Sequence, residues 1–465
     1  MTDTAYRPAR AIHELGDAFY DVVEAAPFPQ HVLRFRNDRH AATVGLGSLT
    51  DAEWIAHFGR FAPLAGSLEA PLALRYHGHQ FRTYNPDLGD GRGFLFAQLY
   101  DDRGRLLDLG TKGSGQTPWS RFGDGRLTLK GGVREVLATE MLEALGVETS
   151  KSFSLIETGE ALVRGDEPSP TRSAVMVRLS HSHIRYGSFQ RLAYLKQPEN
   201  LARLTDYVLR HYGQAEAPDR YAALMDQAVW GAARLAAGFM AAGFVHGVLN
   251  TDNINITGES FDYGPYRFAP RYDRSFTAAY FDHSGLYAFG RQAEALHWNL
   301  HQLALALRTV AETDSLVPAF SEYPLRFEAE LRIAVLGRLG VRPRDDATDL
   351  ALLQAMESAL ETTGLPLDRF YFDWRGGRRR GPSPAEASYA LPAFAPFVAA
   401  IAGYAPAADT AHPYWSDPEP CALLIDEIES IWAAIDESDD WAPFHGKIAA
   451  IRRMGAAMTG EIEPS

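Results

Sequence analysis

The sequence predicts an α+β protein with two lobes, a small strand-rich N-terminal lobe containing one key helix and a larger, mainly helical C-terminal lobe. Short apolar runs separated by glycine and proline fill the first ~180 residues, and one amphipathic stretch interrupts them. From about residue 198 the pattern changes to long apolar stretches with helical spacing. We therefore divide the chain into residues 1–195 and 196–465, which suits a soft prior of roughly 100–200 residues per domain.

The N-terminal lobe is expected to hold strands at Gly93–Leu99, Leu106–Thr111 and Ala174–Leu179, because these runs are short, apolar and bounded by turn residues. Between them, Gly132–Leu145 carries apolar residues at every fourth position and is followed by Gly146. This spacing predicts an amphipathic helix that ends at the glycine.

The C-terminal lobe is expected to be built from helices. Four stretches have long apolar runs with helical spacing: Tyr221–Ala242, Gln292–Leu307, Pro324–Arg338 and Thr348–Thr362. Two later segments, Trp374–Pro384 and Ala405–Pro420, are rich in glycine, proline and charge, which predicts exposed loops. A small strand-rich lobe followed by a larger helical lobe is the layout of protein kinases, although other two-lobed enzymes share it.

Composition and charge limit the kinds of partner. Hydrophobic residues make up 46% and charged residues 22%, as in an ordinary globular protein. A net charge of −14 argues against a nucleic-acid or anionic-membrane binder. The one cysteine, Cys421, excludes an intramolecular disulfide and a zinc–cysteine cluster. With no signal segment and no apolar run of membrane-spanning length, a cytoplasmic location is expected.

Two glycine-rich turns are candidates for nucleotide contact. In Leu88–Gly93 (LGDGRG), Gly89 and Gly91 allow backbone N–H groups to approach a phosphate, and Arg92 can bind it. The same Gly-Asp-Gly-Arg pattern recurs at residues 123–126, with Asp124 and Gly125. Two unrelated hairpin turns are the alternative, since Asp-Gly is a common turn pair. The repetition favours a shared role at a ribose or phosphate.

Four charged residues fit a triphosphate site. Lys112 ends an apolar strand and Glu135 lies near the beginning of the next helix, which is where protein kinases carry a phosphate-contacting lysine and its paired glutamate. Each alone is more often a solvated surface charge. Arg178 ends a later strand and Arg185 follows it, and arginines are well suited to clamping phosphates.

The stretch beginning at His246 resembles a kinase catalytic loop with its base missing. Asn253 follows the histidine by seven residues, and Asp262 begins an Asp-Tyr-Gly that resembles the metal-binding Asp-Phe-Gly of kinases. Val248 occupies the position of the kinase aspartate and cannot accept a proton. Asp252 is the carboxylate in this loop that could replace it. A plain connection with Asn and Asp turn residues is the alternative.

These motifs together resemble the SelO family of protein adenylyltransferases, also called YdiU. The resemblance rests on HGVLNTDNINITGESFDYGPYRF from His246, on KGSG with SRFGDGR at 112–126, on SHIRYG at 182–187 and on AFGRQAEALHWNL at 288–300. It implies a pseudokinase fold that binds ATP in a flipped orientation and transfers AMP to Ser, Thr or Tyr hydroxyls of proteins. Ordinary phosphoryl transfer and an inactive nucleotide-binding scaffold stay open as alternatives, disfavoured by Val248 and by the retained Asp252 respectively.

The resemblance also implies a role for each site residue. Asp252 would be the catalytic base, and Asn253 and Asp262 would bind Mg²⁺ or Mn²⁺. The nucleotide would be held by Gly89, Gly91, Arg92, Lys112 with Glu135, Asp124, Gly125, Arg178, Arg185 and Asp262. UTP is left open as a second nucleotide substrate. Many members carry a cysteine or selenocysteine near the C-terminus, and this chain has none there. No coiled coil or interface pattern indicates an oligomeric state.

Overall fold

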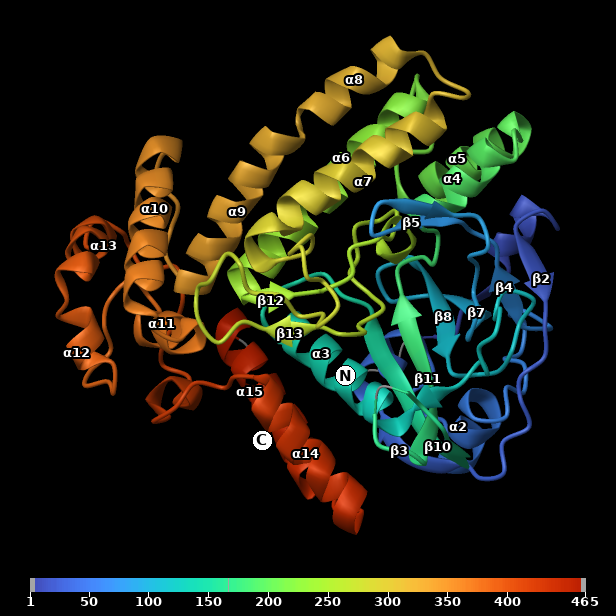
Figure 1. Ribbon diagram of the computed structural model, residues 1–465, viewed down its shortest axis with the longest axis horizontal. Helices are drawn as coiled ribbons and strands as arrows, with labels where there is room; N and C mark the ends of the chain where they lie inside the picture. Colours follow the sequence, from blue (N-terminus) through green and yellow to red (C-terminus); the bar gives the residue numbers. More distant parts are fainter. Residues whose placement is uncertain (1–4, 166, 461–465) are drawn as a thin grey trace.

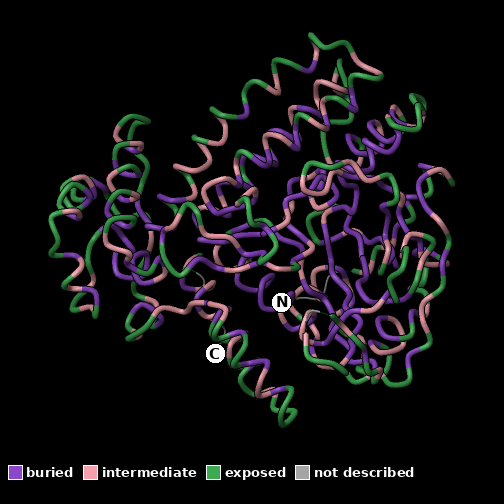
Figure 2. The backbone as a smooth tube through the Cα atoms, in the orientation of Figure 1, coloured by how far each residue is buried: buried purple, intermediate pink, exposed green. Residues whose placement is uncertain are grey.

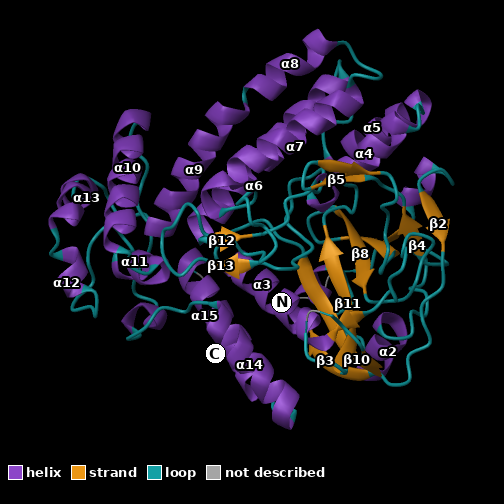
Figure 3. Ribbon diagram, viewed as in Figure 1, coloured by secondary structure: helices purple, strands orange, loops and turns teal. Residues whose placement is uncertain are grey.

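A computed structural model describes residues 5–165 and 167–460. The protein is a mixed α/β structure in which the strands gather at one side and most of the helices at the other (Figures 1 and 3). Within the described residues, every helix is too short or too polar to span a membrane.

The main sheet is antiparallel and curled. Its strand order is β2-β4-β7-β8-β11-β10-β3, with β1 pairing with β7 and β9 with β11. The strands are β1 (Pro8–Ala9), β2 (Tyr20–Val22), β3 (Val32–Arg36), β4 (Leu72–Leu74), β7 (Leu95–Tyr100), β8 (Leu106–Lys112), β9 (Leu127–Thr128), β10 (Lys151–Leu162) and β11 (Thr171–Ser180). Two short hairpins lie outside it: β5 (Gly78–Gln80) with β6 (Thr83–Asn85), and β12 (Phe244–Val245) with β13 (Arg267–Phe268).

The predicted strands at 93–99, 106–111 and 174–179 are confirmed as β7, β8 and β11, which lie next to one another in the sheet. Every residue of β8 is buried, and so is all but one residue of β11. A central strand covered on both faces has a continuous apolar run rather than an alternating one. This burial places the end of β8 and the middle of β11 inside the protein.

The predicted amphipathic helix is α3 (Leu129–Ala144), which begins three residues earlier than expected. Thr128 caps it, its side chain accepting a hydrogen bond from the N–H of Gly131 at 3.1 Å. Helix α3 packs against β10 and β11, and its Val133, Leu137 and Met141 side chains are fully buried. The sequence therefore orients Glu135 by burying the apolar positions on either side of it.

Two C-terminal helices return to the strand-rich side. Helix α15 (Ala442–Thr459) packs along α3, and α14 (Ile425–Ser438) lies beside both (Figure 1). Arg452 binds Glu140 with two contacts of 2.7 Å, and a Cβ on Gly455 would lie 3.2 Å from that of Ala144. The close approach of the two helices holds α3 from its outer side.

The remaining helices form the other half of the protein. The predicted helices at 221–242, 292–307, 324–338 and 348–362 are confirmed as α6 (Arg220–Ala242), α7 (Gln292–Leu307), α9 (Tyr323–Leu339) and α10 (Asp346–Thr363). Helix α6 ends where predicted, at Gly243 with φ of +68°. The others are α1 (Asp38–Thr43), α2 (Asp51–Phe58), α4 (Tyr186–Tyr194), α5 (Pro198–Tyr212), α8 (Thr313–Ser321), α11 (Leu367–Asp373), α12 (Glu386–Tyr389) and α13 (Ala395–Ile401).

The prediction that Trp374–Pro384 is an exposed loop is wrong for its first half. Trp374 and Arg375 are buried, whereas Arg378 and Arg379 are exposed. Over the chain as a whole, buried segments gather inside the strand-rich side and exposed ones along the outer surfaces of the helices (Figure 2). Arg375 donates hydrogen bonds to the carbonyl oxygens of Gly337, Arg338 and Met458. These carbonyls lie in the last turns of α9 and α15, where a cation is stabilised. A charge count alone does not reveal that an arginine is buried among helix ends.

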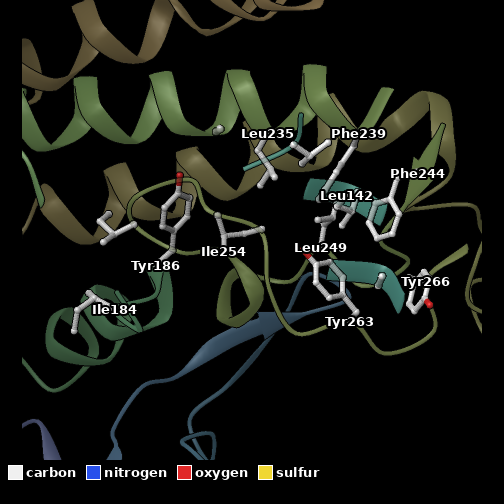
Figure 4. Close-up of a cluster of buried hydrophobic side chains, with 14 of the residues drawn as sticks. Leu142, Ile184, Tyr186, Leu235, Phe239, Phe244, Leu249, Ile254, Tyr263 and Tyr266 are labelled. Carbon is white, nitrogen blue, oxygen red and sulfur yellow. The ribbon is translucent and has the colours of Figure 1, made fainter. Parts of the chain in front are cut away.

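The loop at 246–264 is anchored by apolar residues beneath it. Leu249, Ile254 and Tyr263 are buried and face Leu235 and Phe239 of α6 (Figure 4). These buried side chains hold the loop against α6.

Candidate active site

A cleft of about 650 Å³ lies between the sheet and the loop at 246–264. Its wall contains every site residue expected from the sequence except Glu135 and Asn253. The members that line it are Gly89, Gly91, Arg92, Lys112, Asp124, Gly125, Arg178, Arg185, Asp252 and Asp262. Segments far apart in the sequence therefore meet at one cavity.

Three buried cations, each paired with a carboxylate, lie at the inner end of the cleft. Lys112 is buried at the end of β8, where its Nζ contacts the carboxylate of Glu135 and lies 2.8 Å from Oδ1 of Asp262. Arg178, on β11, places Nη1 3.5 Å from the same Asp262 oxygen. Glu135 thus lies behind the lysine rather than in the cavity wall.

Asp262 is held ionised by these cations. Burial would raise the pKa of its carboxyl group, but Lys112, Arg178 and Arg185 outweigh burial and hold that pKa well below its usual range. Its backbone has φ of +66°, a left-handed conformation that is costly for a residue with a side chain. The surrounding ion pairs hold the carboxylate in this position.

Arg185 joins three parts of the site. Its Nη1 donates to the main-chain oxygen of Asp252 at 2.7 Å, and its Nη2 lies 3.3 Å from Oδ1 of Asp90. The other Asp90 oxygen accepts a hydrogen bond from the N–H of Leu74 at 3.0 Å. Asp90 therefore links the first glycine-rich turn, the end of β4 and Arg185. The expected contacts in this turn were its glycines and Arg92, and they did not include the central carboxylate.

The glycines of the two turns lie where a side chain would collide with neighbouring residues or where the backbone is left-handed. A Cβ on Gly89 would lie 2.4 Å from the ring of Trp119, and one on Gly91 would lie 2.9 Å from the Trp119 carbonyl oxygen. Gly125 has φ of +71°, which favours glycine. Asp124 lies at the outer edge of the cleft, where its carboxylate pairs with Arg164 at 2.7 Å.

Asp252 is a buried carboxylate in a short helical turn, Thr251–Asn253. Its Oδ1 has no hydrogen-bond partner among the residues that the structure describes. Burial raises its pKa to about 6, an effect that Asp262 adds to and Arg185 opposes. A buried carboxylate oxygen without a donor is available to a substrate proton or to a metal ion.

Asn253 lies behind this carboxylate. Its side-chain nitrogen donates to the carbonyl oxygen of Val248 at 2.9 Å, which leaves its amide oxygen for another partner. The imidazole of His246 donates to the carbonyl oxygen of Phe261 at 3.0 Å and so joins the two ends of the loop. His246 and Val248 therefore have structural roles here.

The hairpin β5–β6 supports the loop from outside, and nothing in the sequence indicated this. The N–H of His79 donates to Oγ1 of Thr251 at 2.7 Å, and the N–H of Phe81 donates to Oδ1 of Asn250 at 3.1 Å. Tyr287 donates to the same Asn250 oxygen at 2.7 Å. These contacts fix the residues that precede Asp252.

The donor set suits a hard divalent cation. Asn253 and Asp262, the expected ligands, offer one amide oxygen and one carboxylate, and Mg²⁺ prefers oxygen ligands. Within residues 5–165 and 167–460, no group of three His, Cys, Asp or Glu side chains is arranged to hold a metal. Such a set fits an ion that completes its coordination with phosphate oxygens and water.

Buried phosphate-binding side chains, glycine-rich turns and a carboxylate oxygen without a partner are features that suit a nucleotide substrate and group transfer. The chain belongs to the SelO family, whose description reads "Protein adenylyltransferase SelO" and which matches residues 2–381. This membership confirms the enzyme class expected from the motifs, a nucleotidyltransferase.

Relatives named "Protein nucleotidyltransferase YdiU" are similar to this chain over most of its length. The protein of Gloeobacter violaceus is 46% identical over 96% of this chain and 95% of its own length. That of Trichormus variabilis is 41% identical over 97% and 96%. That of Synechocystis is 51% identical over 72% and 71%.

Proposed function

We propose that this protein transfers AMP from ATP to Ser, Thr or Tyr hydroxyl groups of other proteins and releases diphosphate. The observation that carries the proposal is the buried, unpartnered Oδ1 of Asp252 at a cleft that Lys112 and two arginines also line. Val248, where a kinase has its base, binds Asn253 through its main chain. The carboxylate available to accept a proton is thus displaced by four residues from its kinase position.

A kinase-like two-lobed fold is part of this proposal, with residues 1–195 as the nucleotide-binding lobe and 196–465 as the helical lobe. The buried contact between Lys112 and Glu135 supports it, since kinases pair a strand lysine with a helix glutamate in the same way. Helices α14 and α15 are an addition that packs on α3.

The polarity of the cleft supports a flipped nucleotide. Lys112, Arg178 and Arg185 are buried at the inner end, where they complement a triphosphate. Phe122 and Val163, at the wall of the same cleft, are strongly exposed and offer apolar surface to a base. The phosphates would therefore lie inside and the base outside.

The reaction follows from this arrangement. The acceptor oxygen attacks the α-phosphorus in line, a new P–O bond forms, and the bond to the bridging oxygen of the β-phosphate breaks. Diphosphate leaves with that electron pair, and Lys112, Arg178 and Arg185 stabilise its charge. Oδ1 of Asp252 accepts the acceptor's proton. A Mg²⁺ or Mn²⁺ ion held by Asn253 and Asp262 would neutralise phosphate charge when bound.

The test uses ATP labelled at the α- or the γ-phosphate, with Mg²⁺ and a bacterial protein extract as acceptor. We expect covalent label from α-labelled ATP alone. The label should be stable to hydroxylamine, as linkages to Ser, Thr and Tyr are, and a phosphodiesterase should remove it. Label from γ-labelled ATP alone would establish phosphoryl transfer instead. ATP binding without label from either position would establish a scaffold. A parallel reaction with α-labelled UTP and Mn²⁺ decides whether UMP is transferred as well.

A further inference from the structure

Tyr76 is a buried cleft residue that no motif singled out. Its side chain lines the cleft and is 7% exposed. Among the described residues we find no hydrogen bond to its hydroxyl, and that oxygen is not one of the fully enclosed polar atoms without a partner, so it is open to the cleft that the side chain lines. Burial raises its pKa well above the ordinary value, so the phenol keeps its proton and can donate it in a hydrogen bond.

The backbone fixes this ring against Arg185. The N–H of His77, the next residue, donates to the carbonyl oxygen of Gly187 at 3.1 Å. A Cβ on Gly187 would lie 2.0 Å from the His77 carbonyl oxygen, so this approach requires glycine. The two chain segments are locked together, and the Tyr76 ring lies 4.4 Å from the guanidinium carbon of Arg185.

A second ring contacts the same guanidinium. Phe261 lies 4.7 Å from Arg185 and 5.3 Å from Arg178, measured from the guanidinium carbon to the ring centroid. Arg185 is buried, and its Nε has no hydrogen-bond partner among the described residues. Stacking on aromatic rings therefore contributes to fixing its orientation, together with Asp90 and the Asp252 carbonyl.

We propose that Tyr76 is a further nucleotide-binding residue, whose hydroxyl donates a hydrogen bond to the phosphate chain at the end bound by Arg185. Its ring holds the Arg185 fork in the orientation that meets the same phosphates. This role of Tyr76 goes beyond the proposed function, because phosphate recognition does not depend on which group is transferred. It rests on the proposed function only in requiring ATP as the ligand. A hydrogen bond from a neutral hydroxyl to a phosphate oxygen is charge-assisted and strong.

Equilibrium binding of ATP and of AMP, each with Mg²⁺, tests this on the full chain. Tyr76→Phe removes the hydroxyl and keeps the ring, and we expect ATP to bind about 10-fold more weakly while AMP binding stays within about 2-fold. Tyr76→Leu also removes the stacking and should weaken ATP binding further. Tyr323→Phe is the matched control, because it removes a buried hydroxyl that donates to the Ala293 carbonyl, outside the cleft. It should leave ATP affinity unchanged.

Two results would overturn the inference. The first is an ATP affinity of Tyr76→Phe within 2-fold of the parent, which would show that the hydroxyl does not contact the phosphates. The second is an equal loss for ATP and AMP, which would place the contact at the nucleoside. Neither result would contradict the proposed transfer of AMP. If the unmodified protein bound no ATP, the proposed function would be refuted as well. Tyr76→Phe changes one atom, so the test does not depend on whether Tyr76→Leu folds.

Discussion

Replacing Glu135 by glutamine tests whether the contact behind the cleft floor stabilises the protein. The side chains of Lys112 and Glu135 are 4% and 3% exposed, so neither charge is solvated. Breaking a buried ion pair costs about 3–5 kcal/mol when it leaves an unpaired charge. Here Lys112 keeps Asp262 at 2.8 Å. The loss is therefore closer to that of one hydrogen bond to a charged group, about 2 kcal/mol.

Urea unfolding followed by tryptophan fluorescence measures this difference. Glu135→Gln should lower the unfolding midpoint with an unchanged slope, since the surface exposed on unfolding is the same. Glu328→Gln is the control, because Glu328 pairs with Arg332 at 2.7 Å and is 49% exposed. That change should cost less than about 1 kcal/mol. If both variants unfold at the same urea concentration, the reasoning about the buried contact is wrong.

Three further predictions concern other parts of the protein. Burial raises the pKa of Glu259 to about 7, above its unfolded value, so the protein should lose stability as pH rises from about 4 to 8. Glu259→Gln should remove this loss, which is ~3 kcal/mol in unfolding free energy across that range. Gly125→Ala should weaken ATP binding and lower stability by about 1–3 kcal/mol, because φ is +71° and a Cβ would lie 2.2 Å from the carbonyl carbon of Gly115. A variant with the parent's ATP affinity and urea unfolding midpoint would contradict this prediction. Asn253→Ala should raise the Mg²⁺ concentration needed for half-maximal transfer about 10-fold or more, and an unchanged Mg²⁺ titration would exclude the residue as a metal ligand.

Local patterns in the sequence predicted much of the architecture. Helices such as α6 and α7 have long apolar runs and clear ends, and strands β7, β8 and β11 have short apolar runs between turns. Their type follows from periodicity, which is a local property. The packing of α15 on α3 depends on Arg452 meeting Glu140, far away in the chain, and no local pattern carries that information.

Part of the candidate site could likewise be predicted from local motifs, and part of it could not. Motif spacing indicated Lys112 and Asp262, and the structure brings them to one cleft. Tyr76 and Asp90 were missed because their importance comes from contacts with Arg185, across the sheet. Asp90 lies inside the first glycine-rich turn, where only the glycines and Arg92 were considered. Its carboxylate between two glycines was the sequence signal that could have identified it. Tyr76 lies in no motif.

The central claim is that Asp252 accepts the proton of the acceptor hydroxyl. Asp252→Asn keeps the shape of the side chain and removes its basicity, and the measurement is the rate of transfer from α-labelled ATP beside the dissociation constant of ATP. We expect the rate to fall by about 10²–10⁴-fold, the usual contribution of general base catalysis, with ATP affinity changed by less than about 3-fold. A variant that transfers AMP at the parent rate would contradict the claim.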